Sequence, residues 1–389
     1  MSSPTYDAIV IGAGSVGLPL SYFLTLEGWK VLVVEREHAP GQGQNKAAIG
    51  GVRATHSDPA KITLCLKSIE IFSTWKEKHG TDIGWIEGGY CFPVYREIDQ
   101  IKLKTLLPVQ KSFGLEIDWY GAEEIRRLVP GINPDGLLGG TFSPHDGQVS
   151  PLKTAAAFWR EARDRGCDFR FNEKVTGLIH RGGKIEGIQT PGGAYHAPVV
   201  VNAAGAQALE IGRLVGLEIP VLPDSHEAGI SAPMERFIDP LIVDIRPGPE
   251  GRTTNFYFGQ NDRGQVIFCY TPIDPITGMN RSETSEFMPV ISRRLIELIP
   301  RLRNMMIRRV WRGLYPMTPD GIIILDELHE LKGFYLAVGM CGQGFMLGPG
   351  VGLNMAKFIA HGTPDVDTEI FESVSFYRDF NARRSEALK

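Results

Sequence analysis

The chain has 389 residues, 43% of them hydrophobic and 22% charged, and its formal net charge is −4. This composition is typical of a soluble globular protein with a large core, and it excludes disordered and collagen-like chains. There is no basic tract to suggest a nucleic-acid partner, and no apolar run of about 18 residues to suggest a transmembrane segment.

The cysteines indicate the cellular compartment in which the protein is expected. They are five in number and far apart in the sequence: Cys65, Cys91, Cys167, Cys269 and Cys341. An odd, scattered set speaks against a disulfide framework, a zinc site and an iron–sulfur cluster. The amino terminus also lacks the pattern of a signal peptide. We therefore expect a cytoplasmic protein in a reducing environment, with no catalytic metal.

The first elements form a strand–helix–strand unit. Residues 8–11 are an apolar run that predicts a buried strand, and "GAGSVG" follows at 12–17. Apolar residues then recur at helical spacing as far as Leu26, and Gly28 predicts the end of that helix. A second buried strand is expected over 31–34, with Glu35 at its carboxyl end. Three glycines in this context predict a dinucleotide-binding site.

Each glycine of this motif has a physical reason. Gly12 allows the tight turn, Gly14 lets a diphosphate approach the backbone, and Gly17 lets the helix pack closely on the strand. The free N–H groups at the helix start attract phosphate. Glu35 can accept hydrogen bonds from a ribose. The motif does not distinguish NAD from FAD; Glu35 disfavours NADP, although Arg36 beside it leaves that point open.

Further elements follow in chain order. A helix is expected over 59–78, capped by Ser57 or Asp58 and closed by Gly80, and another from Pro151 to Gly166, capped by Ser150. Between them, 82–145 is irregular in pattern. The remaining predictions are strands near Phe169 and over 175–179, 185–189, 198–206 and 334–340, a hairpin over 255–258 and 265–270, and helices over 285–299 and 351–361.

Five motifs in order resemble the D-amino-acid-oxidase-like (DAO) family of FAD-dependent oxidoreductases. Within it, the likeness is nearest to sarcosine oxidase, glycine oxidase and the β-type subunits of sarcosine, proline and opine dehydrogenases. The motifs are "IVIGAGSVG" at 9–17, "NKAAIGGVR" at 45–53, "HDGQVSPLKTAAAF" at 145–158, "VNAAGA" at 201–206 and "GMCGQGFMLGPGVG" at 339–352.

The resemblance implies an α/β (α+β) fold, in which a glutathione-reductase-type FAD-binding Rossmann domain is interleaved with an antiparallel-sheet substrate domain. We expect the FAD-binding domain to comprise 1–80, 146–218 and 311–389. The substrate-binding domain would comprise 81–145 and 219–310.

The resemblance also implies a set of FAD-binding residues. They are Gly12, Gly14, Ser15, Val16, Gly17, Glu35, Arg36, Asn45, Lys46, Ala47, Ala48, Val175, Ala203, Ala204, Gly205, Gly313, Gly342, Gln343, Gly344, Phe345 and Met346. For Val175 only the backbone is implied. In some sarcosine oxidases a cysteine near the position of Gly313 binds the flavin covalently, so non-covalent FAD is expected here.

The last motif is interpreted as the flavin-binding helix start. Its backbone N–H groups would face the pyrimidine edge of the flavin, where reduction leaves negative charge. Five glycines are more than a helix cap requires, which favours this interpretation over a plain glycine-rich loop. They are Gly342, Gly344, Gly348, Gly350 and Gly352.

The substrate-site candidates are Arg53, Tyr315, Gln343, His226 and Tyr257. Arg53 matches an arginine of the sarcosine and proline members, and a guanidinium suits an amino-acid carboxylate. A surface arginine and a core tyrosine remain the structural alternatives for Arg53 and Tyr315, and His226 and Tyr257 are as readily structural. Met346 replaces a lysine that some members have for oxygen activation, which favours a dehydrogenase over an oxidase.

These features predict FAD-dependent oxidation of a small amino or imino acid, by hydride transfer to flavin N5 and hydrolysis of the imine. The alternative is a flavin-binding subunit of a hetero-oligomeric dehydrogenase, with a structural or electron-relay role. The unusual "DGIIILDE" at 320–327 leaves that alternative open. An aromatic hydroxylase ranks lower, because its second "GD" motif is missing. Proline, sarcosine, glycine, hydroxyproline and opines all remain possible substrates.

Overall fold

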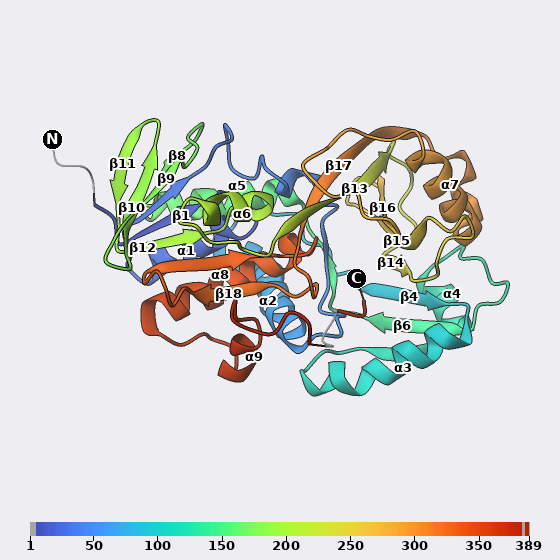
Figure 1. The fold of residues 1–389 in the computed structure, drawn as a ribbon. Coiled ribbons are helices and arrows are strands. Elements are labelled where there is room, and N and C mark those ends of the chain that lie inside the picture. Colours follow the sequence, from blue (N-terminus) through green and yellow to red (C-terminus); the bar gives the residue numbers. More distant parts are fainter. Residues whose placement is uncertain (1–4, 383–385, 389) are drawn as a thin grey trace.

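Two β-sheets organise the molecule, and each forms the centre of one half (Figure 1). The computed structural model describes residues 5–382 and 386–388. The first sheet has six strands in the order β18, β19, β12, β1, β2 and β8. Their bounds are Ile324–Glu327, Phe334–Val338, Val199–Asn202, Ala8–Ile11, Val31–Val34 and Asp168–Arg170.

Side chains of successive residues point to opposite faces of this sheet, and both faces are buried. Five of the six strands are parallel, and only β18 runs antiparallel to its neighbour. Ala8 and Val10 of β1 face a helical layer, whereas Ile9 and Ile11 face the opposite layer. Because both faces are covered, the strands read as continuous apolar runs. This confirms the predicted buried strands over 8–11 and 31–34.

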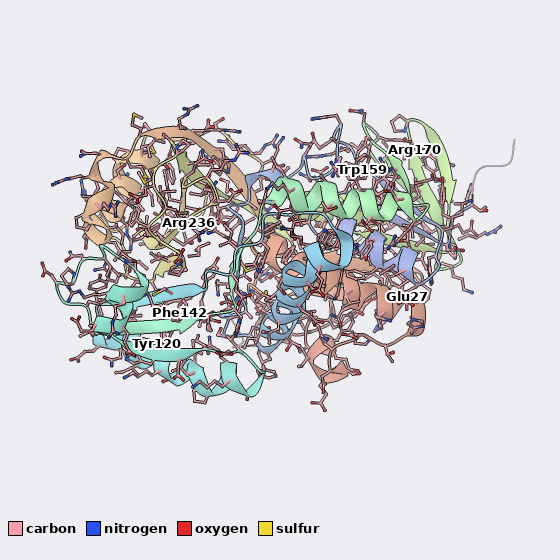
Figure 2. All side chains as sticks on the ribbon, turned by 180° about the vertical axis from the view of Figure 1, so that it is seen from behind. Glu27, Tyr120, Phe142, Trp159, Arg170 and Arg236 are labelled. Carbon is pink, nitrogen blue, oxygen red and sulfur yellow. The ribbon has the colours of Figure 1, made fainter. Side chains whose placement is uncertain are left out.

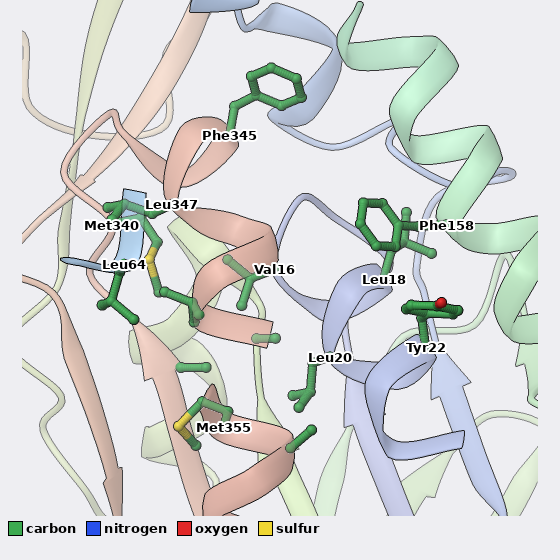
Figure 3. Close-up of a cluster of buried hydrophobic side chains, with 14 of the residues drawn as sticks. Val16, Leu18, Leu20, Tyr22, Leu64, Phe158, Met340, Phe345, Leu347 and Met355 are labelled. Carbon is green, nitrogen blue, oxygen red and sulfur yellow. The ribbon is translucent and has the colours of Figure 1, made fainter. Parts of the chain in front are cut away.

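Four helices cover one face of this sheet. They are α1 (Gly17–Leu26), α2 (Pro59–His79), α5 (Pro151–Asp164) and α8 (Gly344–His361). Figure 3 shows Val16 and Leu20 of this region directed toward α8, and Leu18 and Tyr22 beside Phe158 of α5. The opposite face carries a small antiparallel sheet and a short helix: β9 (Gly177–Arg181), β10 (Lys184–Thr190), β11 (Gly193–His196) and α6 (Ala208–Arg213).

The glycines of α8 mainly serve helix packing. A Cβ at Gly348 would collide with the Ser15 carbonyl, and one at Gly350 with the Leu64 carbonyl. A Cβ at Gly352 would lie 2.6 Å from the backbone nitrogen of Leu20. These three glycines thus have a packing reason of their own, so the number of glycines in the motif does not by itself indicate a flavin site. They are small because α8 crosses α1 and α2 at close range.

The second sheet has eight strands in the order β17, β13, β16, β15, β14, β4, β6 and β5. Adjacent strands are antiparallel except β14 and β4. Their bounds are Ile307–Met317, Leu222–Ser231, Val266–Pro272, Thr253–Gln260, Leu241–Asp244, Tyr90–Val94, Gly139–Ser143 and Asp118–Gly121. The helices of this half are α3 (Glu97–Ser112), α4 (Ala122–Leu128) and α7 (Phe287–Leu298).

Figure 2 separates the two halves from behind. Tyr120 and Phe142, whose ring centroids lie 5.9 Å apart, belong to the eight-stranded half together with Arg236. Glu27, Trp159 and Arg170 belong to the other half. The short elements between and beside the sheets are η1 (Asn45–Ala47), β3 (Gly51–Val52), β7 (Gly147–Gln148), η2 (Gly205–Gln207), η3 (Pro300–Asn304) and α9 (Thr368–Glu372).

Several predicted boundaries are confirmed by their caps. The Asp58 side chain accepts from the N–H groups of Ala60 and Lys61 at the start of α2, and Gly80 closes that helix with φ 67°. Ser150 caps α5 through Lys153 N–H. The predicted hairpin is the antiparallel pair of β15 and β16. Such local signals need no tertiary context, which is why the sequence places them well.

Three local predictions are wrong. The segment 82–145 is regular, since it holds β4, α3, β5, α4 and β6. Helix α8 begins at Gly344 rather than Val351, because Pro349 near its start removes only one intrahelical bond. Val175 lies just before β9, which starts at Gly177.

The sheets draw on separated segments of the chain. The six-stranded sheet uses strands from 8–34, 168–202 and 324–338, and the eight-stranded sheet uses 90–143, 222–272 and 307–317. This matches the predicted interleaved fold class. The proposed boundary between 310 and 311 falls inside β17.

Two further observations concern the whole described chain. All five cysteines are free and buried. Among residues 5–382 and 386–388, no helix is both long and apolar enough to cross a bilayer.

Candidate functional site

A long cavity of about 260 Å³ lies between the two sheets. Its floor is made by residues that directly follow the strands of the six-stranded sheet: Gly12 after β1, Glu35 after β2, Ala203 after β12 and Met340 after β19. Its roof is one face of the eight-stranded sheet. In open α/β sheets, ligands bind at the carboxyl ends of the parallel strands, and this cavity lies at those ends.

The glycine loop after β1 is shaped for close approach. Gly12 has φ 108°, and a Cβ there would lie 2.7 Å from the Ala203 carbonyl oxygen. Gly17 packs against the Gly12 carbonyl, so it supports the loop rather than lining the cavity. A Cβ at Gly14 would meet nothing within 4 Å. Gly14 therefore leaves open a part of the cavity wall that any side chain would fill.

Glu35 is 8% exposed, and its carboxylate holds the glycine loop. One oxygen accepts from Ala13 N–H at 2.7 Å, and the other from Glu37 N–H at 2.8 Å. Each carboxylate oxygen can accept a second hydrogen bond. Glu35 also lines the cavity, beside Arg36, so it combines a structural contact with capacity for a ligand hydroxyl.

The segment that contains η1 is tied to the roof. Gln44 Oε1 accepts from Leu314 N–H at 2.8 Å, and Ala47 carbonyl accepts from the Trp311 indole at 2.9 Å. Asn45 donates to the Pro151 carbonyl at 2.9 Å. These bonds place Asn45, Ala47 and Ala48 on the cavity wall, whereas the Lys46 side chain is exposed and away from it.

The start of α8 faces the cavity with free donors. Leu347 N–H donates to the Gln343 carbonyl at 3.0 Å, the first bond of the helix. The N–H groups of the three preceding helical residues have no intrahelical acceptor, as at any helix start. Those residues, Gly344, Phe345 and Met346, all line the cavity. Gln343 is buried beside them, and its Oε1 has no hydrogen-bond partner among the described residues.

Polar side chains gather on the roof at one end of the cavity. Tyr257 Oη and Tyr315 Oη lie 2.6 Å apart, and the His226 ring stacks on Tyr315 with centroids separated by 3.9 Å. His226 Nε2 lies 3.1 Å from Asp224 Oδ2. His226 is 6% exposed, and its Nδ1 has no partner in the part of the chain that the structure describes.

Burial and hydrogen bonding determine which groups at this end of the cavity are ionised. Loss of water around the phenols raises the pKa of both Tyr257 and Tyr315 well above the usual value, so both stay neutral. Burial alone would raise the pKa of Asp224. The hydrogen bonds from the His226 ring and the Ser225 N–H outweigh burial and hold that pKa below its usual range. Asp224 is therefore ionised, and Nε2 of His226 carries the proton that it accepts.

Arg53 lies below the roof and is 6% exposed. Its Nη1 contacts the Thr55 carbonyl and, at 3.3 Å, His56 Nδ1. Its Nη2 donates to the Leu388 carbonyl at 2.6 Å. Burial and the charges of Arg53 and Lys61 lower the pKa of His56 well below its usual range, so His56 is neutral. Arg53 also lines the cavity and is not a surface arginine.

Asp146 explains part of the third motif. It is fully buried, and it accepts from Ala54 N–H at 2.9 Å and from Thr55 Oγ1 at 2.7 Å. The aspartate thus fixes the segment that carries Arg53. Burial raises its pKa to about 6 despite these hydrogen bonds.

Nearly all predicted site residues meet at this cavity. Every one lines it except Gly17 and Lys46. Lining residues that sequence reasoning missed include Gln44, Tyr90, Glu173, Cys269, Thr271 and Cys341. Cys341 carried one usable signal, since it lies inside the last glycine-rich motif. It has φ 50°, unusual for a residue with a side chain.

The residues fit a flavin dinucleotide. Gly14 leaves room for a diphosphate at the start of α1, Glu35 offers acceptors for a ribose, and the free N–H groups of α8 suit an anionic ring edge. A parallel nucleotide-binding sheet under an antiparallel roof defines a dinucleotide-dependent oxidoreductase. The family can now be named: a model of the FAD-dependent oxidoreductases of the DAO type matches residues 7–358, so the chain belongs to that family and FAD is its cofactor.

Solved structures and curated relatives agree on this family. The L-proline dehydrogenase from P. horikoshii superposes with a TM-score of 0.90 and 28% identity, over 97% of this chain and 98% of that one. Glycine oxidase from Geobacillus kaustophilus has the same fold, with a TM-score of 0.85 at 24% identity over 96% and 99% of the two chains.

Curated relatives differ in length. Human (Homo sapiens) mitochondrial sarcosine dehydrogenase is 26% identical over 96% of this chain, which spans only 42% of that protein. Subunit HcnC of hydrogen cyanide synthase from Pseudomonas aeruginosa is 24% identical and is matched over 96% of both chains. The chain thus covers less than half of the sarcosine dehydrogenase but nearly all of the HcnC subunit.

Proposed function

We propose that the protein oxidises a small amino or imino acid at the carbon next to nitrogen. One observation carries the proposal: a buried arginine, a neutral phenol pair and an imidazole line the same cavity as the start of α8. No carboxylate other than Asp224 pairs with that group among the described residues, and Asp224 is already bound to His226. The site therefore favours an anionic group on its ligand.

Arg53 would bind the carboxylate of the substrate. A guanidinium has five N–H donors in a plane, and two neighbouring ones match the two oxygens of a carboxylate. The burial of Arg53 strengthens such a pair, because water does not screen it. Tyr315 and Tyr257 would add a neutral O–H donor from the roof.

His226 would hold the amine in its reactive form. Hydride leaves the carbon only when the neighbouring nitrogen has a free lone pair. Because Nε2 of His226 donates to Asp224, Nδ1 is an acceptor, and it is buried without a partner among the described residues. It can therefore accept a hydrogen bond from the N–H of an unprotonated amine.

FAD, when bound, supplies the two-electron acceptor. The protein's contribution at that end is electrostatic. The N–H groups of Gly344, Phe345 and Met346 present the positive end of the α8 dipole, which stabilises negative charge on a bound ring.

The test is an anaerobic screen of amino and imino acids against the purified holoprotein. Proline, sarcosine, glycine, hydroxyproline and opines would be compared, with flavin absorbance followed at about 450 nm. At least one should bleach the flavin, and Arg53→Ala should weaken that amine's affinity strongly. A protein whose flavin is bleached by dithionite but by no amine would contradict the proposal.

A role within a larger complex is the second candidate. The match to HcnC, a synthase subunit, over nearly its whole length supports it. Met346 at the start of α8 also supports a dehydrogenase that passes electrons to a partner or carrier rather than to oxygen. We expect the amine-reduced flavin to reoxidise slowly in air and rapidly with an artificial dye. Fast reoxidation by air alone would contradict a dehydrogenase.

A further inference from the structure

Glu386 and Leu388 are buried beside the segment that carries Arg53, whereas Ala387 between them is exposed. Glu386 is 3% exposed and Leu388 is 2% exposed. Figure 1 shows the dark red trace of this segment next to β4. The contacts that bury Glu386 and Leu388 there can be named.

Glu386 anchors this segment. Its Oε1 accepts from Ser57 N–H at 3.0 Å, from Ser57 Oγ at 2.8 Å and from Leu388 N–H at 2.8 Å. Its Oε2 makes no hydrogen bond among the described residues, but it lies 3.9 Å from Lys61 Nζ, whose charge stabilises the buried carboxylate. The neutral His56 ring lies 3.6 Å from the same oxygen.

Leu388 joins the two halves. Its side chain belongs to the hydrophobic cluster that includes Tyr90 and Val243, two residues that also line the cavity. Its carbonyl oxygen accepts from Arg53 Nη2 at 2.6 Å. The segment thus contacts Arg53 directly on one side and packs near the cavity wall on the other.

The donors of Arg53 are divided between protein and cavity. Nη1 is occupied by Thr55 and His56, and one Nη2 hydrogen by Leu388. Among the described residues, no acceptor takes the Nε–H or the second Nη2 hydrogen. Nε and Nη2 are neighbouring nitrogens, and donors on them match the spacing of carboxylate oxygens. The protein contacts therefore hold Nη1 and part of Nη2 and leave donor capacity at Nε and Nη2.

We propose that residues 386–388 form a positioning element for Arg53, which holds the guanidinium with its Nε–Nη2 edge toward the cavity and so sets the affinity for a substrate carboxylate. Glu386 fixes the segment, and the Leu388 carbonyl fixes the arginine. The role in turnover rests on the proposed function, but carboxylate binding does not depend on turnover.

The test uses the full-length holoprotein with Glu386→Ala and Leu388→Ala, and acetate as a carboxylate that lacks an amine. Acetate affinity is measured from the change in flavin absorbance on titration. Leu388→Ala keeps the carbonyl but removes the side chain that packs the segment beside Tyr90 and Val243. Both variants should bind acetate about tenfold or more weakly, with unchanged FAD content. Glu386→Gln, which keeps an acceptor for Ser57, should be affected less. Arg181→Ala is the matched control, because it removes only an exposed ion pair with Glu186 in the small antiparallel sheet.

Amine substrates provide the second measurement. For an amino or imino acid that reduces the flavin, Glu386→Ala should raise KM and change kcat little. With the corresponding amine lacking the carboxylate, the variant and the parent protein should behave alike. Folded Glu386→Ala and Leu388→Ala proteins with unchanged acetate affinity would overturn the inference. So would equal losses with acidic and carboxylate-free amines. If no amine is oxidised, only the proposed function is rejected, because the acetate titration tests the role of residues 386–388 independently of turnover.

Discussion

The hydroxyl oxygens of Tyr257 and Tyr315 lie 2.6 Å apart on the roof of the cavity. One phenol must donate to the other, so a single O–H remains for a ligand. Loss of surrounding water raises both pKa values well above normal, and therefore neither phenol ionises in the neutral range. The pair acts as a fixed neutral donor.

Removal of either hydroxyl should weaken substrate binding. In Tyr315→Phe or Tyr257→Phe, the remaining hydroxyl loses its partner and its orientation, at a cost of about 1–2 kcal/mol. KM for the best amine should rise roughly tenfold. FAD content should not change. Ultraviolet titration of the parent protein should show no phenolate from this pair below about pH 10. A phenolate signal at neutral pH that disappears in both variants would refute the assignment.

The glycine loop gives a prediction that separates binding from folding. At Gly14 a side chain meets open space, so Gly14→Leu should fold but fill the diphosphate position. We expect apoprotein of near-normal unfolding free energy with FAD affinity reduced at least about tenfold. Gly17→Ala collides with the Gly12 carbonyl and should lower the unfolding free energy by about 2–4 kcal/mol. Apoprotein denaturation and FAD titration distinguish the two; equal effects on stability would contradict this account.

Asp146 makes stability depend on pH. Burial raises its pKa from 3.8 to about 6 in the folded protein. The folded state then holds the proton more tightly than the unfolded chain. Asp146 therefore contributes up to about 3 kcal/mol to the unfolding free energy. This contribution is fully present below pH 3.8 and is lost as pH rises through about 6. Asp146→Asn should flatten this dependence in denaturant titrations. The prediction is contradicted if the contribution of Asp146 to the unfolding free energy of the parent protein increases as pH rises over that range.

FAD should leave the denatured protein. Gly313 lines the cavity at the position where some sarcosine oxidases have a flavin-linking cysteine. Cys269 also lines it, but burial raises the pKa of this thiol to about 12, and a thiolate is needed for nucleophilic attack. Unfolding in guanidinium followed by ultrafiltration should release all yellow colour. Retention of flavin absorbance on the denatured chain would indicate a covalent bond.

Sequence reasoning succeeded where signals are local. The unit from Ala8 to Glu35 was predicted because glycine spacing and two apolar runs fix it without distant contacts. It failed over 82–145. There Ile98 and Ile101 of α3 are 68% and 66% exposed, so the apolar residues do not mark the buried face. The strands β4 and β6 contain Pro93, Gly139 and Gly140, which are unfavourable in strands.

The site could be predicted only in part for the same reason. Arg53 and the last glycine-rich motif carry their own patterns, but the contact between Arg53 and Leu388 joins positions 335 residues apart. No repeating pattern in the sequence indicates a contact between such distant residues. Asp146 likewise acts through Ala54 and Thr55, which only the folded chain brings beside it.

The interleaved strand order has a consequence for biosynthesis. Strand β1 lies beside β12, and β12 beside β19, so the nucleotide-binding sheet remains open until residue 338 has left the ribosome. Strand β1 must wait for β12, since Ala8 pairs with Val199, synthesised about 190 residues later, and such non-local pairing is slow. Nascent chains of this protein should therefore bind their yellow cofactor only after residue 338 has emerged, and until then they should depend on chaperones.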